Sequence, residues 1–422
     1  MNFFSPSHAI LSLVIGCAVF CTTSCEKKKE SINADELFQE TEKALNSSYI
    51  FFDDHRDEIF SSMYSASIKK LNSNDDKSGN TRTALVAALN TYDGTEQRLK
   101  IYEVLKSSLA ALPEGQNSFI PPESLFWSRD PERDAGIGLV IRQDGPGKFM
   151  AIDTLEGSAS HRENMELGKY IIAVDDIKVS GMDLEELVGR IKGPADSSVK
   201  LTFSDRSYKL VRGKVSFQNI INSTWDLSGK NKAEYIILRS TLPGSKDQLK
   251  ALIENLDKPS AIILDIRKLQ PGDFAESFNI ADLFLTSGRM GTIKTKNETD
   301  IVFEADPEIS YRGKIYLLVG SNQSPYADVI ALALKRSDMV KIIGTDISGK
   351  NSFITKMIPT ASGIELRITS GYILDSDNFP FYKSEIKADY RVRDILPPHA
   401  PLKEADSGDP AQMKAQELLT ET

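Results

Sequence analysis

Serine hydroxyls at one predicted turn are the side chains of this sequence best placed for nucleophilic chemistry. The stretch SNQSPYADVIALALK, residues 321–335, follows an apolar run typical of a buried strand, and its second half predicts a helix. A tight turn between a strand and a helix exposes one side chain beside the unpaired N–H groups of the helix start, as in many hydrolases. The turn contains Ser321, Ser324 and Pro325. It is therefore a candidate nucleophile site.

A lysine is the plausible general base for such a serine. Beyond the first 25 residues, histidine occurs only at His55, His161 and His399, so the sequence between residues 214 and 390 has none. This distribution argues against a Ser–His–Asp triad in that region. A desolvated ammonium group has a lowered pKa and can accept the proton of a serine hydroxyl near neutral pH. The candidate is Lys350, in the run IIGTDISGK.

Both candidates also have a purely structural interpretation. Ser324 would cap the helix that follows it, because serine is a preferred N-cap residue and Pro325 suits the first helical position. Lys350 would then be a solvated loop lysine, and His55, among acidic neighbours, a solvated surface residue. We favour the cap, because a proline fixes its own φ and restricts the residue before it to extended conformations.

The elements that must position these residues alternate between strand and helix. The apolar runs YIILRS, AIILDIR, KIYLLVG and KIIGT have the length of strands, and DQLKALIENL, SFNIADLFL and ADVIALALK lie between them. Continuous apolar strands separated by amphipathic helices predict a sheet that is covered on both faces. We expect an α/β layered core over residues 214–400 and a C-terminal helix within residues 401–422.

Upstream, residues 135–213 have the pattern of a small β domain. GIGLVIRQ, KFMAIDTL, SVKLTFS and SYKLVRG are short β-rich runs, while SASHRENME and DLEELVGRI predict helices. Still earlier, residues 33–112 repeat apolar residues at three- and four-residue steps, which predicts a helical domain within residues 25–134. The expected fold class is α+β and multidomain.

The first residues have the layout of a targeting segment. An apolar stretch of signal-peptide length, AILSLVIGCAVF, is followed by Cys25 and then abruptly by the charged run EKKKE. This layout resembles a bacterial lipoprotein signal, which implies a signal peptide over residues 1–24, a lipid on Cys25 and a membrane anchor. Cys17 and Cys21 are rival acceptors, and a plain cleaved signal or a short anchor are the alternatives. Glu26 resembles a sorting signal for the outer membrane, so we expect a periplasm-facing location in the bacterial cell envelope.

Composition argues against several classes of function. The 422 residues include 51 Lys and Arg and 60 Asp and Glu, so the formal net charge is −9, which argues against nucleic acid as a partner. All three cysteines lie at or before Cys25, so the rest of the chain has no disulfide and no cysteine nucleophile. The histidines, cysteines and carboxylates lack the spacing of metal ligands, and we therefore expect no metal and no cofactor.

The order of these elements resembles the carboxy-terminal processing, or tail-specific, serine peptidases. The resemblance is carried by the helical domain, a strand ending LDIR before a Pro-Gly turn, the element IADLFL, a lysine after IIG, and the closing runs IELRITSGYIL, KADYRV and DPAQMKAQELL. Residues 135–213 resemble a PDZ domain. The resemblance implies an exported enzyme that holds the C-terminal tail of a polypeptide and cleaves with a serine–lysine dyad.

The PDZ resemblance also implies a peptide-binding groove. A bound peptide would add its backbone to the strand after the glycine-flanked loop, and the N–H groups of that loop would receive the terminal carboxylate. Leu184 and Val188, on the predicted helix, would form one wall of the groove. The carboxylate loop would consist of Gly136, Ile137, Gly138 and Leu139.

The nucleophile of the family is missing from this sequence. The family's turn reads approximately V-N-x-G-S-A-S-A-S-E, and placing its glutamate on Asp328 puts the nucleophilic serine on Pro325. Lys350 lies 25 residues further on, which is the family's spacing from serine to lysine. Ile354 stands where the family usually has a glutamine that orients the lysine.

The oxyanion turn of the family, R-N-N-P-G-G, is altered as well. It appears here as RKLQPGD, with Gly272 retained and Asp273 in place of a glycine. An acidic side chain at that place should oppose the charge of an oxyanion. These changes favour a pseudopeptidase that binds C-terminal peptide tails without cleaving them. An active endopeptidase with a displaced Ser324–Lys350 dyad is the alternative, and a structural lipoprotein with neither activity is a third possibility.

Overall fold

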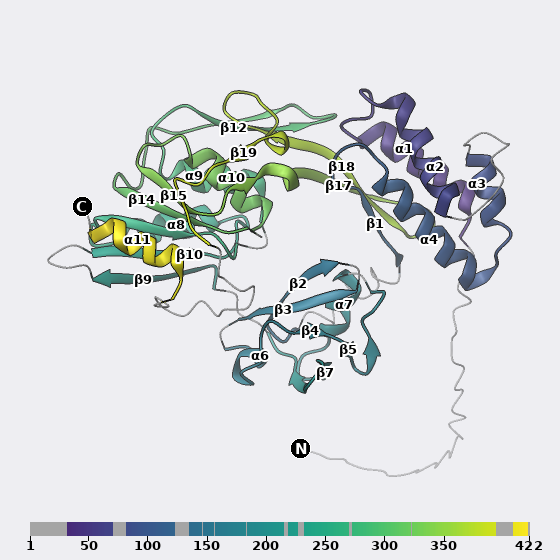
Figure 1. Ribbon diagram of the computed structural model, residues 1–422, viewed down its shortest axis with the longest axis horizontal. Helices are drawn as coiled ribbons and strands as arrows, with labels where there is room; N and C mark the ends of the chain where they lie inside the picture. Colours follow the sequence, from purple (N-terminus) through teal and green to yellow (C-terminus); the bar gives the residue numbers. More distant parts are fainter. Residues whose placement is uncertain are drawn as a thin grey trace, which may run out of the picture.

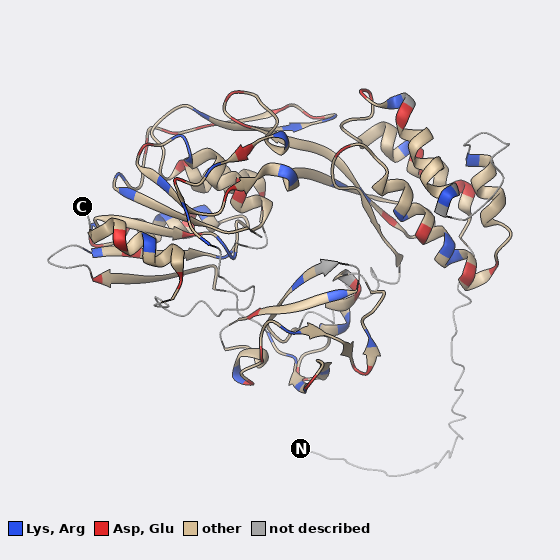
Figure 2. Ribbon diagram, viewed as in Figure 1, with Lys and Arg blue, Asp and Glu red and all other residues tan. Residues whose placement is uncertain are grey.

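The computed structural model describes most of the chain beyond the targeting segment. The described residues are 32–70, 82–122, 135–145, 147–155, 157–182, 184–214, 218–226, 232–269, 272–321, 323–393 and 408–420. Cys25 and its predicted signal peptide lie outside them. Within these ranges no helix is both long and apolar enough to cross a membrane. Acidic and basic residues are interspersed over all regions of the described chain (Figure 2).

A six-stranded sheet forms the centre of the C-terminal region (Figure 1). Its order is β20-β15-β14-β11-β10-β9, and every pair is parallel except β9 with β10. The continuous apolar runs of β10, β11, β14 and β15 are buried on both faces, as the sequence predicts. The strands are β9 (Ile220–Asp226), β10 (Lys232–Leu238), β11 (Ala261–Asp265), β14 (Lys314–Val319), β15 (Val340–Gly344) and β20 (Tyr390–Arg391).

Helices cover both faces of this sheet. Because side chains alternate along a strand, Ile236 and Leu238 of β10 lie in the core beneath one group of helices, whereas Tyr235 and Ile237 lie in the core on the other face. The first group is α8 (Ser245–Glu254), α9 (Phe274–Asp282) and α10 (Pro325–Leu334), and the other face is covered by α11 (Pro410–Thr420).

A second sheet connects this core to the helical region. It contains β18, which pairs with β1, β12 and β17, and β13, which pairs with β12. The long β17–β18 hairpin bridges the two parts of the molecule in Figure 1. The bounds are β1 (Ser118–Ile120), β12 (Arg289–Thr295), β13 (Ile301–Glu304), β17 (Phe353–Pro359) and β18 (Glu365–Leu374), with a small separate pair β16 (Ile347–Ser348) and β19 (Glu385–Ile386).

The N-terminal helices share their core with the β17–β18 hairpin. Phe353, Leu366 and Ile368 of the hairpin are buried in the same cluster as the apolar faces of the helices. The ring of Phe51 stacks on that of Tyr372, with 5.6 Å between centroids. The helices are α1 (Ala34–Ser48), α2 (Arg56–Lys70), α3 (Arg82–Leu89) and α4 (Gly94–Ala110).

The β domain, residues 135–213, has two small sheets around its own core. One sheet has the order β2-β3-β4 and the other β6-β5-β7-β8. The helix predicted over SASHRENME is only one turn long, because Asn164 adopts φ 45° and ends it. The elements are β2 (Leu139–Gly145), β3 (Lys148–Thr154), α6 (Ala159–Arg162), β4 (Tyr170–Ile171), β5 (Ala173–Val174), β6 (Ile177–Lys178), α7 (Leu184–Ile191), β7 (Ser198–Thr202) and β8 (Ser207–Val211).

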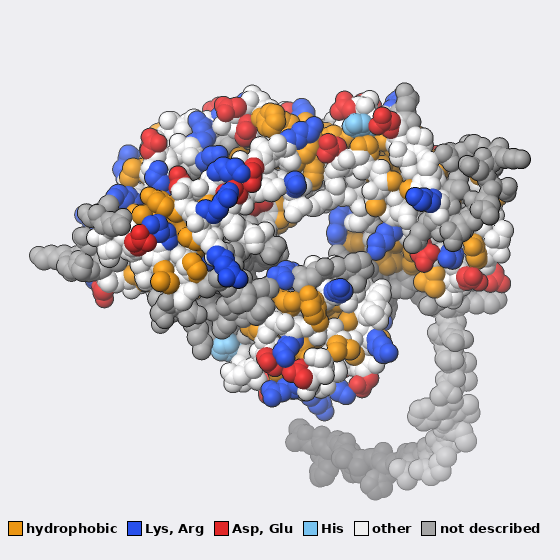
Figure 3. Space-filling view, in the orientation of Figure 1, with side chains coloured by type: hydrophobic (Ala, Val, Ile, Leu, Met, Phe, Trp, Pro, Cys, Tyr) orange, Lys and Arg blue, Asp and Glu red, His pale blue; other side chains and the backbone are white. Residues whose placement is uncertain are grey.

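Ion pairs join the β domain to the α/β core. The Asp153 carboxylate, at the end of β3, lies 3.4 Å from the Arg239 guanidinium and 3.7 Å from the Lys268 ammonium. All three side chains are largely buried. Burial lowers the pKa of Lys268, and the Asp153 carboxylate opposes that shift. Figure 3 shows an opening between the β domain, the core and the β17–β18 hairpin.

A buried arginine ties the C-terminal helix to the central sheet. The Arg267 guanidinium, just after β11, lies 2.6 Å from the Asp265 carboxylate and 2.7 Å from the Asp409 carboxylate at the start of α11. The Tyr235 hydroxyl donates to Asp265 at 2.7 Å and accepts from the Gln412 amide at 3.0 Å. Burial would raise the pKa of Asp265, but the charge of the Arg267 guanidinium, together with the hydrogen bonds from Arg267 and Tyr235, holds that pKa below its usual value.

Replacement of Asp409 by asparagine should destabilise the core strongly. The amide keeps the shape of the side chain but leaves a buried guanidinium with one anionic partner fewer, and breaking a buried pair costs about 3–5 kcal/mol. Urea unfolding followed by tryptophan fluorescence measures this, because Trp225 stacks on Tyr235 beside the cluster. Asp377→Asn, at an exposed position, is the control and should change stability by less than about 0.5 kcal/mol. Equal stability of the two variants would contradict the role given to Arg267.

Candidate functional site

The candidate nucleophile turn lies at the carboxyl end of β14, where Ser324 caps helix α10. Its backbone is extended, with φ −75° and ψ 156°, as the following proline requires. Its hydroxyl oxygen accepts a hydrogen bond from the N–H of Ala327 at 3.4 Å. Pro325 occupies the first turn of the helix, where its missing N–H costs nothing. The Ser324 hydroxyl is therefore used to satisfy the helix terminus.

The candidate base, Lys350, lies on a 3₁₀ turn (Gly349–Asn351) and its side chain is exposed. This turn lies close to α10. No hydrogen bond joins Lys350 to Ser324 in the part of the chain that the structure describes. A lysine acts as a base when its ammonium group is desolvated, and an exposed ammonium group keeps its hydration. The structure thus brings the two candidates into one neighbourhood without forming a dyad.

The oxyanion turn is closed by neighbouring side chains. Gly272 pairs with Thr241 in a parallel bridge, and a Cβ atom at position 272 would lie 2.2 Å from the Thr241 hydroxyl oxygen and 2.6 Å from the Tyr326 ring. The Tyr326 ring also packs on Phe274, with 4.8 Å between centroids. When the glutamate of the family pattern is placed on Asp328, an alanine of that pattern falls on Tyr326. An aromatic ring therefore fills the space beside the retained glycine.

Asp273 has a structural role in this turn. Its carboxylate accepts a hydrogen bond from the N–H of Glu276 at 2.9 Å and so caps α9. Its own N–H donates to the carbonyl and to the hydroxyl oxygen of Thr241, each at 3.0 Å. An oxyanion site needs N–H groups that are aimed at the substrate oxygen. The N–H of Asp273 is already hydrogen-bonded within the turn.

A chain of hydrogen bonds braces the candidate nucleophile turn. The Gln323 side chain accepts from the N–H of Gly320 at 3.0 Å and donates to the Asp328 carboxylate at 2.8 Å. Burial raises the pKa of Asp328 to about 7, and the hydrogen bond from Gln323 opposes the shift. Asp328 stands at the position of the glutamate in the family pattern, and its buried carboxyl group braces the turn.

The predicted carboxylate loop of the β domain presents unused donors. The carbonyls of Ile137 and Gly138 accept from Ser160 and Leu155 at 3.0 and 2.8 Å. Among the described residues, by contrast, the N–H groups of Ile137 and Gly138 have no recorded acceptor. Gly138 has φ 70°, a left-handed conformation that suits glycine. These two N–H groups, on residues that are themselves buried, are therefore the candidate donors to an anionic group.

Among the described strands, the one after this loop is paired along one edge only. Strand β2, which begins at Leu139, is at the end of the sheet β2-β3-β4. On α7, Leu184 and Val188 are partly exposed, whereas Leu187 between them is buried in the domain core. Gly136, before the loop, pairs with Gly213 and fixes the start of the loop. The arrangement offers an edge strand, free donors and an apolar helix face.

Tyr326 and Thr241 were not identified from the sequence. Tyr326 could have been identified, because it is a large aromatic residue at a position where the family pattern has alanine. No local signal marked Thr241, because its contact with Gly272 joins segments about 30 residues apart.

Comparisons with known proteins agree with the family resemblance. The model of "Peptidase family S41" matches residues 232–392. The "Carboxy-terminal processing protease CtpA" of Bacillus subtilis is 24% identical over 322 residues, which cover 75% of this chain and 68% of the relative. The "Tail-specific protease" of Haemophilus influenzae is 29% identical over 233 residues, which cover 51% of this chain and 33% of the relative.

Two solved structures are similar in fold. The photosystem II D1 C-terminal processing protease has a TM-score of 0.60 and 19% identity, covering 86% of this chain and 94% of that one. A putative S41 protease from Bacteroides fragilis has a TM-score of 0.53 and 12% identity, covering 90% and 96%. The family predicted from the sequence is confirmed: residues 232–392 are a peptidase family S41 domain, and the chain is a relative of the carboxy-terminal processing proteases.

Proposed function

We propose that this protein is a pseudopeptidase that binds the C-terminal tails of polypeptides without cleaving them. The observation that carries the proposal is the nucleophile turn, where Pro325 stands at the serine position and the neighbouring Ser324 caps α10. A proline side chain has no nucleophile, and among the described residues no hydrogen bond joins the Ser324 hydroxyl to Lys350, the candidate base that would activate it. The turn therefore lacks an activated nucleophile that could attack a peptide carbonyl.

The surroundings of the turn support the loss of catalysis. Among the described residues, the exposed Lys350 has no hydrogen bond to a serine, the N–H of Asp273 is bonded to Thr241, and the Tyr326 ring lies against Gly272. The nucleophile and the oxyanion site are thus both changed, whereas the lysine is retained without a serine partner, so a serine restored at position 325 would not by itself restore the oxyanion site. The alternative, an endopeptidase using Ser324 and Lys350, requires Ser324 to leave its cap.

Peptide binding is supported by the β domain. The free edge of β2 can pair with an extended peptide backbone, and the N–H groups of Ile137 and Gly138 can donate to a terminal carboxylate. Leu184 and Val188 would contact apolar side chains near the C-terminus of the peptide. We further propose that a lipid on Cys25 anchors the protein in the bacterial cell envelope, facing the periplasm.

The full chain should bind but not cleave an unfolded reporter with a free apolar C-terminus. Digestion is followed by mass spectrometry for the parent, Ser324→Ala and Lys350→Ala, and binding by fluorescence anisotropy. We expect no products from any of the three proteins. An amidated reporter should bind at least tenfold more weakly, because the loop loses its anionic partner. Cleavage by the parent that both substitutions abolish would establish the displaced dyad and refute the proposal.

Ser324→Ala should destabilise the protein by about 1 kcal/mol through loss of the helix cap, without changing reporter affinity. Ser324→Asn is the matched control, since asparagine is an equally good N-cap residue and should retain most of the stability. Urea unfolding measures both. If Ser324→Ala is as stable as the parent, the hydroxyl does not act as a helix cap.

Val188→Lys should weaken reporter binding at least tenfold, because it places a charged group on the apolar wall of the groove. Ile177→Lys introduces the same charge at an exposed position on β6 and should leave the affinity unchanged. Anisotropy titrations of the two variants make the comparison. Equal affinities would show that the peptide binds elsewhere.

A further inference from the structure

A second site lies at the opposite edge of the central sheet from the candidate nucleophile turn. Ser324 and Gly272 follow the carboxyl ends of β14 and β11, whereas Gly313 and Met339 immediately precede the amino ends of β14 and β15. A pocket of about 350 Å³ opens at this amino edge. Its volume is within the range of small-molecule sites, about 300–1,000 Å³. A ligand there would lie away from the candidate nucleophile turn at the carboxyl edge.

Three segments that are distant in the sequence build this pocket. The segment after α9 contributes Phe284, Leu285, Thr286 and Ser287; the loop before β14 contributes Ile309, Tyr311, Arg312 and Gly313; and the α10–β15 turn contributes Arg336, Ser337 and Met339. Phe284 and Leu285 are buried and belong to the main core. The Tyr311 hydroxyl donates to the carbonyl of Pro259 at 3.0 Å. The pocket therefore has an apolar floor built on a rigid core.

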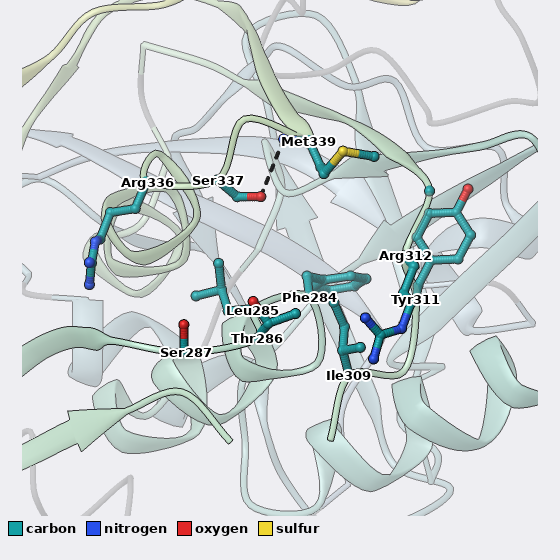
Figure 4. A pocket seen from close by; sticks show the side chains of 11 residues that line it. Phe284, Leu285, Thr286, Ser287, Ile309, Tyr311, Arg312, Arg336, Ser337 and Met339 are labelled. Carbon is teal, nitrogen blue, oxygen red and sulfur yellow. Dashed lines mark hydrogen bonds between the residues drawn. The ribbon is translucent and has the colours of Figure 1, made fainter. Parts of the chain in front are cut away.

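Two arginines lie on opposite sides of this floor. Figure 4 shows Arg336 on one side, Arg312 on the other, and Phe284, Leu285 and Thr286 between them. The Arg336 guanidinium lies against Gly288, since a Cβ atom there would be 3.1 Å from its nitrogen. Gly288 has φ 91°, a conformation in which a side chain would be strained. The backbone thus leaves room for the guanidinium at the pocket rim.

Both guanidinium groups are available to a ligand. In the part of the chain that the structure describes, neither Arg312 nor Arg336 forms an ion pair or a side-chain hydrogen bond. Asp282 and Glu308, which come shortly before the lining segments in the sequence, lie close to Lys246 and Lys250. The hydroxyls of Thr286 and Ser287, at the pocket rim, can add hydrogen bonds. An arginine binds a carboxylate with two parallel hydrogen bonds, which makes such a contact directional.

We propose that this pocket binds a linear dicarboxylate, with its methylene chain on the floor formed by Phe284 and Leu285 and one carboxylate at each arginine. Two cations on opposite walls favour a ligand with two anionic ends. The side chains of Phe284 and Leu285 between them would contact the hydrocarbon body of such a ligand. The proposal is independent of the peptide-binding function, because no residue is shared with the β domain or the nucleophile turn.

Isothermal titration of the full chain with linear dicarboxylates from glutarate to azelate tests this proposal. Heptanoate and 1,7-heptanediol are the singly charged and neutral controls. We expect at least one dicarboxylate to bind at least tenfold more tightly than both controls. Arg312→Gln and Arg336→Gln should each weaken that binding at least fivefold. Lys335→Gln removes the same charge one residue from Arg336, outside the pocket, and should change the affinity by less than twofold.

The proposal fails if no dicarboxylate binds, or if heptanoate or the diol binds as tightly as every dicarboxylate. It also fails if Lys335→Gln weakens binding as much as the two arginine variants, since the effect would then be one of net charge alone. All three substituted residues are exposed, so unfolding is not expected, and thermal melts of the variants verify that the fold is retained.

Discussion

The buried Arg267 guanidinium, held between the carboxylates of Asp265 and Asp409, is the constraint on which the rest of the core depends. It fixes the end of β11 and attaches α11 to the opposite face of the sheet. An unpaired charge at this depth would cost several kcal/mol, so the three groups must be placed together. Because Arg267 lies only five residues before Gly272, the same cluster fixes where the following turn begins. The position of the candidate site therefore depends on this cluster.

Around that turn, groups that a serine peptidase would direct at its substrate are bonded to one another instead. Ser324 and Asp273 cap helices, Thr241 accepts from the N–H of Asp273, and the Tyr326 ring lies on Gly272. Each of these contacts stabilises the fold. In this peptidase-family scaffold, the groups of the candidate reaction centre are bonded to one another, which is the basis of the proposed loss of cleavage.

Local patterns in the sequence predicted the strands and most helices, because continuous apolar runs and amphipathic repeats need no knowledge of partners. They also predicted that Ser324 can cap the helix, because Pro325 restricts the backbone of Ser324 to extended conformations. The contact between Tyr326 and Gly272, the ion pairs of Asp153 with Arg239 and Lys268, and the core shared by the helices and β17–β18 were not predicted. Each joins segments far apart in the chain, and one sequence alone contains no signal for such pairs.

The most direct measurement of the central claim is covalent labelling of the full chain with a fluorophosphonate, which reacts with activated serines. Intact-mass analysis reports the number of adducts, and peptide mapping locates them. An unactivated, capping Ser324 predicts no adduct at that residue. An adduct on Ser324 that disappears in Lys350→Ala would show a working serine–lysine pair and contradict the account.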